Sequence, residues 1–342
     1  MKANDMFPVR RLSCLFLSAC ALQHAMAAPV DDATRQRVVR TLAERMARHC
    51  HDAALGRRVA DTLLQRLAAH AYDGPVEPQD FAAMLDREVR ALSGDKHGGV
   101  IYTEEAQEPD NPPDFVPDMM RTDPEGWLRR RGRVLAEARK SRFGFPKSER
   151  LAGNVAYVRI DEFMEPEIVG QTVKAEMVAV RDAKALILDL REHGGGTPET
   201  GTLLSAWLFD DKPVHLNDQV TRGIGRVLPV WTQPVASDLR FGSSKPVYLL
   251  VGPETFSAGE NFAYTLQALG RAVVVGAPTG GGAHGGRGYR LDAHFVGSIP
   301  VRKTVNAVTG TDWDGAGVQP DVRVDPAQAL ERALALARKT AP

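Results

Sequence analysis

Apolar residues recur every three or four positions in the first third of the chain, and this spacing predicts three helices between residues 31 and 92. The three apolar stripes are Val38, Leu42, Met46 and Cys50, then Val59, Leu63, Leu67 and Ala71, then Phe81, Leu85, Val89 and Leu92. Gly56 and the Gly74-Pro75 pair are predicted to break the helices. We therefore expect an N-terminal three-helix domain over residues 30–103, which closes with a glycine-rich turn and a short strand at residues 100–102.

The next segment, residues 104–150, has a different composition. Residues 104–123 are acidic and rich in proline, which predicts a linker or surface loop. Residues 124–141 can form a helix whose many charges are typical of a solvated face.

From residue 151 onward, short apolar runs alternate with helical periodicity. Strands are predicted at residues 155–160, 185–190, 247–251 and 272–276, and helices at residues 166–182, 198–208 and 258–269. Continuous apolar runs are typical of strands that are buried on both faces of a parallel sheet. Residues 151–342 are therefore predicted to form an α/β domain, in which ligands bind beyond the carboxyl ends of the strands.

The first 27 residues have the parts of a secretory signal peptide. Lys2, Arg10 and Arg11 precede a mostly apolar run at residues 12–21, and residues 25–27 read Ala-Met-Ala. This run is too short to span a bilayer, which needs roughly 20 residues, so we expect export to the periplasm or secretion and no transmembrane span. Two alternatives stay open: an apolar tail, and a lipobox at residues 17–20 with Cys20 as a lipid anchor.

Composition narrows the class of protein further. Lys plus Arg and Asp plus Glu are both 43, so no basic excess points to a nucleic-acid partner. Three Cys cannot build a disulfide scaffold. No H-E-x-x-H motif or comparable ligand spacing is present, so we expect no metal and no cofactor. The oligomeric state is left open.

Ser257 is the first candidate for chemistry, because it lies between a predicted buried strand and a predicted helix. The N-terminus of that helix favours developing negative charge. Ser257 and Glu260 also form an S-x-x-E capping box, which needs no catalysis, so both interpretations stay open. Thr255 stands where a G-x-S-x-G motif has its first glycine, which argues against an ordinary α/β-hydrolase.

Glycine-rich turns supply the other candidates. The N–H groups of residues 194–196 can form an oxyanion hole, or the glycines can simply permit a tight turn. His97 lies in a glycine-rich turn and His284 follows glycines 280–282, so either can be a general base for a serine hydroxyl or a structural residue.

Three segments together resemble the C-terminal-processing (tail-specific) serine peptidases. They are residues 186–196 (LILDLREHGGG), residues 255–260 (TFSAGE) and residues 313–321 (WDGAGVQPD). Residues 93–97 (SGDKH), after the predicted helices, resemble the branch related to the interphotoreceptor retinoid-binding protein. The resemblance covers residues 35–340 approximately, and it implies a crotonase-like ββα sheet domain.

The resemblance also implies roles for individual residues. Ser257 matches the nucleophile, and the N–H of Ala258, with that of Gly194 or Gly195, matches the oxyanion hole. Gly282 stands where the bacterial processing proteases have the lysine of a Ser-Lys dyad. No PDZ module fits between residues 98 and 150.

The missing lysine base and the missing PDZ module both resemble the tricorn-like arrangement, which uses histidine as the base. His97 then matches the base, with His284 as the alternative. Asp314, where the family usually has Glu, or Glu260 would orient the imidazolium. His193 stands where the family usually has Asn.

The function implied is that of a serine-type peptidase that cleaves peptide or protein substrates by acyl transfer to Ser257. One alternative is a catalytically inactive protein on the same fold that binds a ligand or peptide. A second is an acyl-CoA enzyme, which export disfavours.

Overall fold

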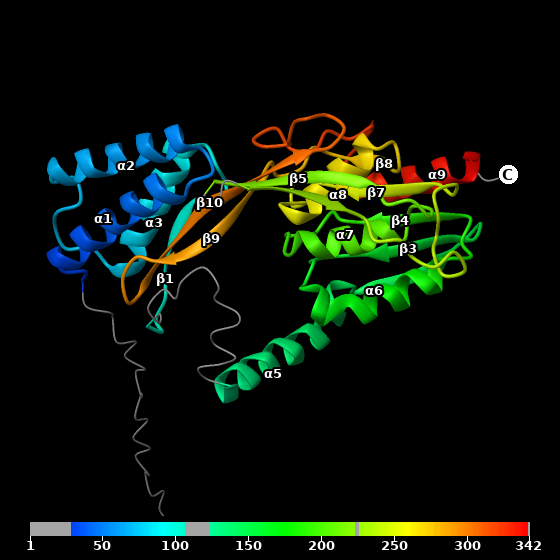
Figure 1. The fold of residues 1–342 in the computed structure, drawn as a ribbon, viewed down its shortest axis with the longest axis horizontal. Coiled ribbons are helices and arrows are strands. Elements are labelled where there is room, and N and C mark those ends of the chain that lie inside the picture. The colour runs from blue at the N-terminus through cyan, green and yellow to red at the C-terminus, as the bar shows by residue number, and fades with distance from the viewer. Residues whose placement is uncertain (1–28, 107–123, 223–225, 341–342) are drawn as a thin grey trace, which may run out of the picture.

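The computed structural model describes residues 29–106, 124–222 and 226–340 of the 342-residue chain. The predicted signal peptide, with Cys20, lies outside the described residues, and so does most of the predicted linker at residues 104–123. Figure 1 shows two lobes, one made of the N-terminal helices and one built around a larger sheet, and long strands that run between them.

Three helices form where the apolar periodicity predicts them: α1 (Asp32–His49), α2 (Ala53–Ala68) and α3 (Pro78–Ser93), followed by strand β1 (Gly99–Tyr102). The prediction that Gly56 breaks a helix is wrong, because Gly56 lies inside α2. A Cβ atom on Gly56 would lie 2.3 Å from the carbonyl oxygen of Met46. The missing side chain therefore allows α1 and α2 to pack closely.

The helical lobe does not close a core from helices alone. Its buried cluster includes Tyr289, Leu291, Phe295 and Ile299, which lie on or beside strands β9 (His284–Arg290) and β10 (Phe295–Asn306). In this cluster Phe295 packs edge-on against Phe81 of α3, with ring centroids 5.7 Å apart. A separate three-helix domain stays a prediction, since the lobe buries its apolar face against strands from the far end of the chain.

The larger sheet has six strands in the order β11-β8-β7-β4-β3-β2. Their bounds are Lys147–Leu151 for β2, Val155–Arg159 for β3, Ala185–Asp189 for β4, Val247–Val251 for β7, Val273–Gly276 for β8 and Val322–Arg323 for β11. Neighbouring strands are parallel except for β2 and β3. The four predicted strands are present, and β2 starts the sheet before residue 151.

Helices cover both faces of this sheet (Figure 1). Leu186 and Leu188 of β4 belong to the core with α6 (Pro166–Val180), α7 (Pro198–Ala206) and α8 (Ala258–Ala268). Ile187, which points to the other face, belongs to the core with α9 (Ala329–Thr340). Helix α5 (Pro124–Lys140) forms as predicted. Short 3-10 turns lie at Arg142–Gly144 and Pro326–Gln328.

A second sheet connects the two lobes. Its strand order is β1-β10-β5-β6, with β9 paired to β10, and β5 (His215–Thr221) and β6 (Arg226–Trp231) complete it. The first half of β10 pairs with β1, and its second half pairs with β5 in the other lobe. One continuous strand therefore links the helical lobe, and the residues just before β1, to the lobe that holds the larger sheet.

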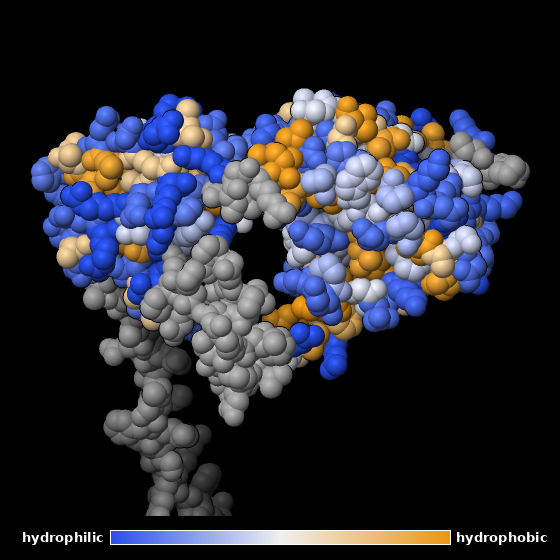
Figure 2. Space-filling model, in the orientation of Figure 1, coloured by the Kyte–Doolittle hydropathy of each residue, from blue (hydrophilic) through white to orange (hydrophobic). Residues whose placement is uncertain are grey.

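The molecular surface carries its apolar residues in small groups. Figure 2 shows these groups over both lobes, separated by polar residues, with an open space between the lobes below the strands that join them. Within the described ranges, no helix combines the length and the apolar character that a membrane span requires.

Candidate functional site

Ser257 occupies the sharp turn between β7 and α8. Its φ angle is +52°, a conformation that costs a residue with a side chain about 1–3 kcal/mol. Its N–H donates to the carboxylate of Glu260 at 2.8 Å. The turn presents a half-buried Ser257 hydroxyl at the carboxyl edge of the sheet, directly before a helix N-terminus.

His97 reaches this hydroxyl from the other lobe. Its Nε2 lies 3.0 Å from the Oγ of Ser257. The ring stacks on Phe256, with ring centroids 4.9 Å apart, and Lys96 donates to the carbonyl oxygen of Gly280. Burial lowers the pKa of His97 below its ordinary value, so the imidazole is neutral at neutral pH and its Nε2 can accept a proton.

Asp95 is the acid that lies beside His97. Its Oδ1 accepts the His97 N–H at 2.8 Å and lies 3.8 Å from His97 Nδ1, beyond hydrogen-bond length. The Asp95 side chain is 2% exposed. Burial alone would raise the pKa of Asp95, but hydrogen bonds from His284 and from the His97 backbone outweigh it and lower the pKa. Sequence reasoning did not select Asp95, although its Asp-x-His spacing is typical of an aspartate that caps its own turn.

The structure does not bring Asp314 or His284 to the Ser257–His97 pair. His284 Nδ1 lies 2.8 Å from Asp95 Oδ2 and 3.6 Å from Asp314 Oδ1. Asp314 also accepts the Ala283 N–H at 3.3 Å. Both residues therefore stand behind Asp95, one layer away from the reacting hydroxyl.

Glu260 is buried and holds backbone rather than an imidazole. It accepts the N–H groups of Ser257, Gly281 and Gly282 and the hydroxyl of Thr279, at 2.5 to 2.9 Å. Burial raises the pKa of Glu260, and these four donors oppose that rise. The contact with the Ser257 N–H is the one that the capping interpretation predicts. The other three contacts tie this turn to the loop at residues 279–282, and the described contacts of Glu260 do not include His97.

Gly282 lies where the resemblance places a lysine base. A Cβ atom on Gly282 would lie 2.3 Å from the Phe256 ring and 2.8 Å from His97 Cε1. The Gly282 carbonyl accepts the indole N–H of Trp313 at 3.0 Å. The space that a lysine side chain would need is therefore filled by the His97 and Phe256 rings.

The three predicted oxyanion donors differ in whether another group already accepts their N–H. The Gly194 N–H donates to the Asp161 carbonyl at 3.0 Å, and the Gly195 N–H donates to His193 Nδ1 at 3.1 Å. Burial lowers the pKa of His193 to about 4, which keeps Nδ1 available as an acceptor. Among the described hydrogen bonds, none takes the Ala258 N–H. A Cβ on Gly195 would lie 3.0 Å from the Ser257 Cβ, so this glycine permits close approach to the hydroxyl.

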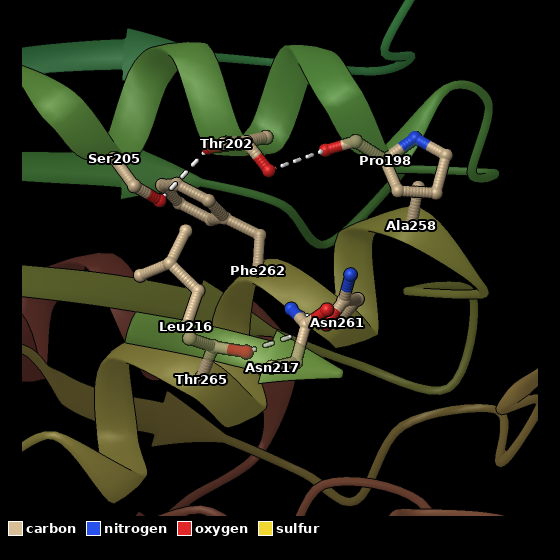
Figure 3. A pocket seen from close by; sticks show the side chains of 10 residues that line it. Pro198, Thr202, Ser205, Leu216, Asn217, Ala258, Asn261, Phe262 and Thr265 are labelled. Atoms are coloured by element: carbon tan, nitrogen blue, oxygen red, sulfur yellow. Dashed lines mark hydrogen bonds between the residues drawn. The ribbon is translucent and has the colours of Figure 1, made fainter. Parts of the chain in front are cut away.

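A narrow pocket opens beside Ala258, between α7, β5 and α8 (Figure 3). The volume within the pocket that the centre of a water-sized group can occupy is about 10 Å³. Its lining mixes apolar and uncharged polar side chains: Pro198, Thr202, Ser205, Leu216, Asn217, Asn261, Phe262 and Thr265. No charged residue lines the pocket within the described part of the chain.

Comparison with known proteins decides the family. The model described as peptidase family S41 matches residues 154–324, which are half of the chain and include the Ser257 turn and the glycine loops. The chain belongs to peptidase family S41. The match starts after the helical lobe, so it does not include His97 or Asp95.

Family S41 relatives extend the comparison. The chloroplastic carboxyl-terminal-processing peptidase 2 of Arabidopsis thaliana is 27% identical over 193 residues, which are 56% of this chain and 36% of the relative. This chain therefore spans about a third of that relative's length.

Two solved structures share the fold over most of this chain. A lipoprotein from Streptococcus agalactiae aligns over 89% of this chain and 96% of its own, with a TM-score of 0.56 and 13% identity. The tricorn protease aligns over 89% of this chain and 37% of its own, with a TM-score of 0.53 and 13% identity. The likeness in both cases includes the helical lobe as well as the larger sheet.

Proposed function

We propose that this S41 family member is a serine-type peptidase that cleaves peptide or protein substrates by acyl transfer to Ser257. The observation that carries the proposal is the 3.0 Å approach of His97 Nε2 to a serine hydroxyl on a strained strand-to-helix turn. A neutral imidazole at that distance can take the hydroxyl proton as the oxygen attacks a carbonyl carbon. The same imidazole then returns the proton to the leaving amine.

Asp95 is the positioning acid of this mechanism. Its carboxylate holds the turn of His97 through the backbone N–H and faces Nδ1 across 3.8 Å. The imidazolium that forms during acyl transfer is stabilised by this negative charge. Asp314 and Glu260, which the resemblance offers for this role, support His284 and the backbone of the site instead.

The Ala258 N–H is the first donor to the oxyanion, because it is the first N–H of α8, next to the nucleophile, and no described hydrogen bond takes it. The Gly195 N–H becomes the second donor once substrate competes with His193 for it. A single oxyanion donor is worth about 3 kcal/mol of transition-state stabilisation in comparable sites.

We assign the substrate side chain that precedes the scissile bond to the pocket beside Ala258, which adjoins the nucleophile in the chain. This pocket is small and uncharged, so it favours small residues such as alanine or serine at that position.

The crotonase-like arrangement is part of the proposal. It is supported by the order β2, β3, α6 at the start of the larger sheet and by the strand-helix pairs β4–α7 and β7–α8 that follow. Export is proposed from residues 1–27 of the sequence, with Cys20 as an alternative lipid anchor.

A serine-directed fluorophosphonate probe tests the function. We expect the whole chain to be labelled and to cleave an unstructured protein substrate, and we expect Ser257→Ala to abolish both. The matched control is Ser148→Ala in edge strand β2, which should keep both signals. Labelling and cleavage that persist in Ser257→Ala would overturn the nucleophile. A wild-type chain that binds peptides but is neither labelled nor active would favour the non-catalytic binding protein.

A further inference from the structure

A second cluster of polar side chains lies behind the His97–Ser257 pair, on the other side of Asp95. Asp95 directs Oδ1 toward His97 and Oδ2 toward two more imidazoles, those of His51 and His284. His51 follows α1 in the helical lobe, and His284 begins β9. The rings of His51 and His284 lie 3.8 Å apart between centroids. The three residues are separated in sequence, so no ligand spacing is visible in the chain.

The candidate ligand atoms of this cluster lie close together. One nitrogen of each imidazole and one carboxylate oxygen of Asp95 lie within 4.8 Å of one another. Asp95 Oδ2 is 2.8 Å from His284 Nδ1 and 3.8 Å from His51 Nε2. Ligand atoms of a tetrahedral zinc ion, with bonds of about 2.0–2.1 Å, lie roughly 3.3 Å apart. The observed separations bracket that value.

One candidate ligand atom of the cluster, His51 Nε2, makes no hydrogen bond to the described residues. This atom is buried, and the His51 side chain as a whole is only 11% exposed. A neutral imidazole nitrogen without a partner in a buried site costs free energy unless something binds it. The His51 backbone N–H donates to the Pro300 carbonyl at 2.7 Å, but no hydrogen bond of the described residues accounts for the buried Nε2.

The surroundings fit a cation. A cavity of about 340 Å³ adjoins the three residues and is also lined by Asp52, Asp312, Asp314 and Lys303. His284 Nε2 faces Asp312 Oδ2 at 3.8 Å, the kind of outer carboxylate that orients a metal-binding histidine. Three of these four additional charged side chains in the cavity lining are acidic. The fourth, Lys303, pairs with Asp312 at 3.3 Å.

We propose that His51, Asp95 and His284 bind a divalent transition-metal ion of the zinc class, with a fourth position open to the cavity. Two imidazoles with one carboxylate are borderline-to-hard ligands that suit Zn²⁺ rather than Ca²⁺ or Mg²⁺, which prefer oxygen donors. The sequence motifs predicted no metal, because the ligands come from the end of α1, the turn before β1 and the start of β9.

Occupancy of this site acts on the peptidase through Asp95, a step that rests on the proposed function. A metal ion bound to Oδ2 draws negative charge away from Oδ1, which faces His97. The imidazolium that forms during catalysis then loses stabilisation. We therefore expect Zn²⁺ to lower kcat about tenfold or more without blocking the substrate pocket.

Calorimetric titration of the whole chain with Zn²⁺ tests the site directly. The protein carries no polyhistidine tag and is first treated with EDTA, which is then removed by dialysis. We expect saturable binding of one ion per chain. We expect His51→Ala and His284→Ala to weaken it at least roughly 100-fold. The matched control is His70→Ala, a histidine with an 80% exposed side chain, which should keep wild-type affinity.

Each outcome decides the proposal. Absence of one-to-one binding in the wild type, or wild-type affinity in both histidine variants, overturns it. If either variant fails to fold by circular dichroism, Co²⁺ titration of the wild type decides: intense visible bands of tetrahedral cobalt support the site, and a weak octahedral spectrum overturns it. Zinc binding by a chain without peptidase activity would keep the metal site and remove the proposed function.

Discussion

His97 Nε2 lies 3.0 Å from Ser257 Oγ, although the two residues are 160 positions apart and belong to different lobes. The contact depends on β10, because His97 stands two residues before β1, and β1 pairs with the first half of β10. The second half of β10 pairs with β5, beside α8 and the Ser257 turn. The candidate site therefore forms only when the two lobes dock in this register.

The pairing of Asp95 with His97 gives the first prediction. We expect Asp95→Asn to lower kcat by about 10²–10⁴, because the amide cannot stabilise the imidazolium by charge. The comparison variant is Asp314→Asn, because Asp314 contacts His284 and Ala283 and does not contact His97. We expect this variant to lose at least about tenfold less kcat than Asp95→Asn. Both are measured as kcat on a peptide substrate with EDTA present. Equal losses in the two variants would restore Asp314 to the role that the resemblance gave it.

The contact of Gly282 with two rings gives the second prediction. Gly282→Ala places a methyl group 2.3 Å from the Phe256 ring and 2.8 Å from His97, so one or both rings must shift. A displacement of about 1 Å at a reacting group can cost on the order of 100-fold in rate. We expect a loss of that size in kcat/KM, with fluorophosphonate labelling slowed in parallel.

Gly132→Ala is the control for this substitution, since a Cβ on Gly132 in α5 meets nothing within 4 Å. It should leave activity unchanged and stabilise the helix by up to about 1 kcal/mol. Full activity in Gly282→Ala would show that His97 tolerates displacement and would weaken the geometric argument for it as the base.

The sequence predicted the parts of this molecule whose physics is local. Continuous apolar runs located β4 and β7, and helical periodicity located α1, α3 and α8. Strand β9 (His284–Arg290) gave no signal, because its sequence HGGRGYR contains three glycines and no alternation of apolar residues. Only pairing with β10 makes it a strand.

The site was predictable to the extent that it follows strand ends. Ser257 and Gly195 lie where an α/β sheet places ligands. Glycine-rich turns offered His97 and His284 equally, and only the resemblance to the tail-specific peptidases favoured His97 and added Ala258. The role of Asp95 and the diversion of the Gly195 N–H to His193 depend on packing between segments that are distant in the chain or on loop geometry. The Asp-x-His spacing predicts only that Asp95 caps its own turn, and no spacing predicts the contact of Gly195 with His193.

The buried carboxylate of Asp189 gives a prediction on stability. It accepts the hydroxyl of Tyr157 at 2.7 Å and two guanidinium N–H groups of Arg191 at 2.6 and 2.9 Å. Burial alone would raise the pKa of Asp189, but the hydrogen bonds from Arg191 and Tyr157 outweigh it and lower the pKa. We expect Asp189→Asn to lower the free energy of unfolding by about 3–5 kcal/mol at pH 7.

The sign of its pH dependence follows from the lowered pKa. A group whose pKa is lower in the folded state contributes its stability above the unfolded-state pKa, near 3.9, and loses it as the pH falls through the folded-state pKa. Urea unfolding at pH 7, 5, 4 and 3 should therefore show a constant difference between wild type and Asp189→Asn down to about pH 5, and a shrinking one below pH 4. Asp161→Asn, which breaks a partly exposed pair with Arg159, should cost less than about 1 kcal/mol throughout.

The narrow pocket beside Ala258 gives the last prediction, on specificity. Leu216 of β5 forms part of its wall (Figure 3) and is 2% exposed, so Leu216→Ala enlarges the pocket. We expect wild type to prefer alanine over leucine before the scissile bond, and Leu216→Ala to shift the ratio of kcat/KM toward leucine by about 10–100-fold. A peptide series that varies only this residue measures the ratio, and Leu228→Ala on β6, outside the pocket, should leave it unchanged. Because the ratio compares two substrates on one enzyme, partial unfolding of Leu216→Ala does not alter it. An unchanged ratio in Leu216→Ala would place the substrate side chain elsewhere.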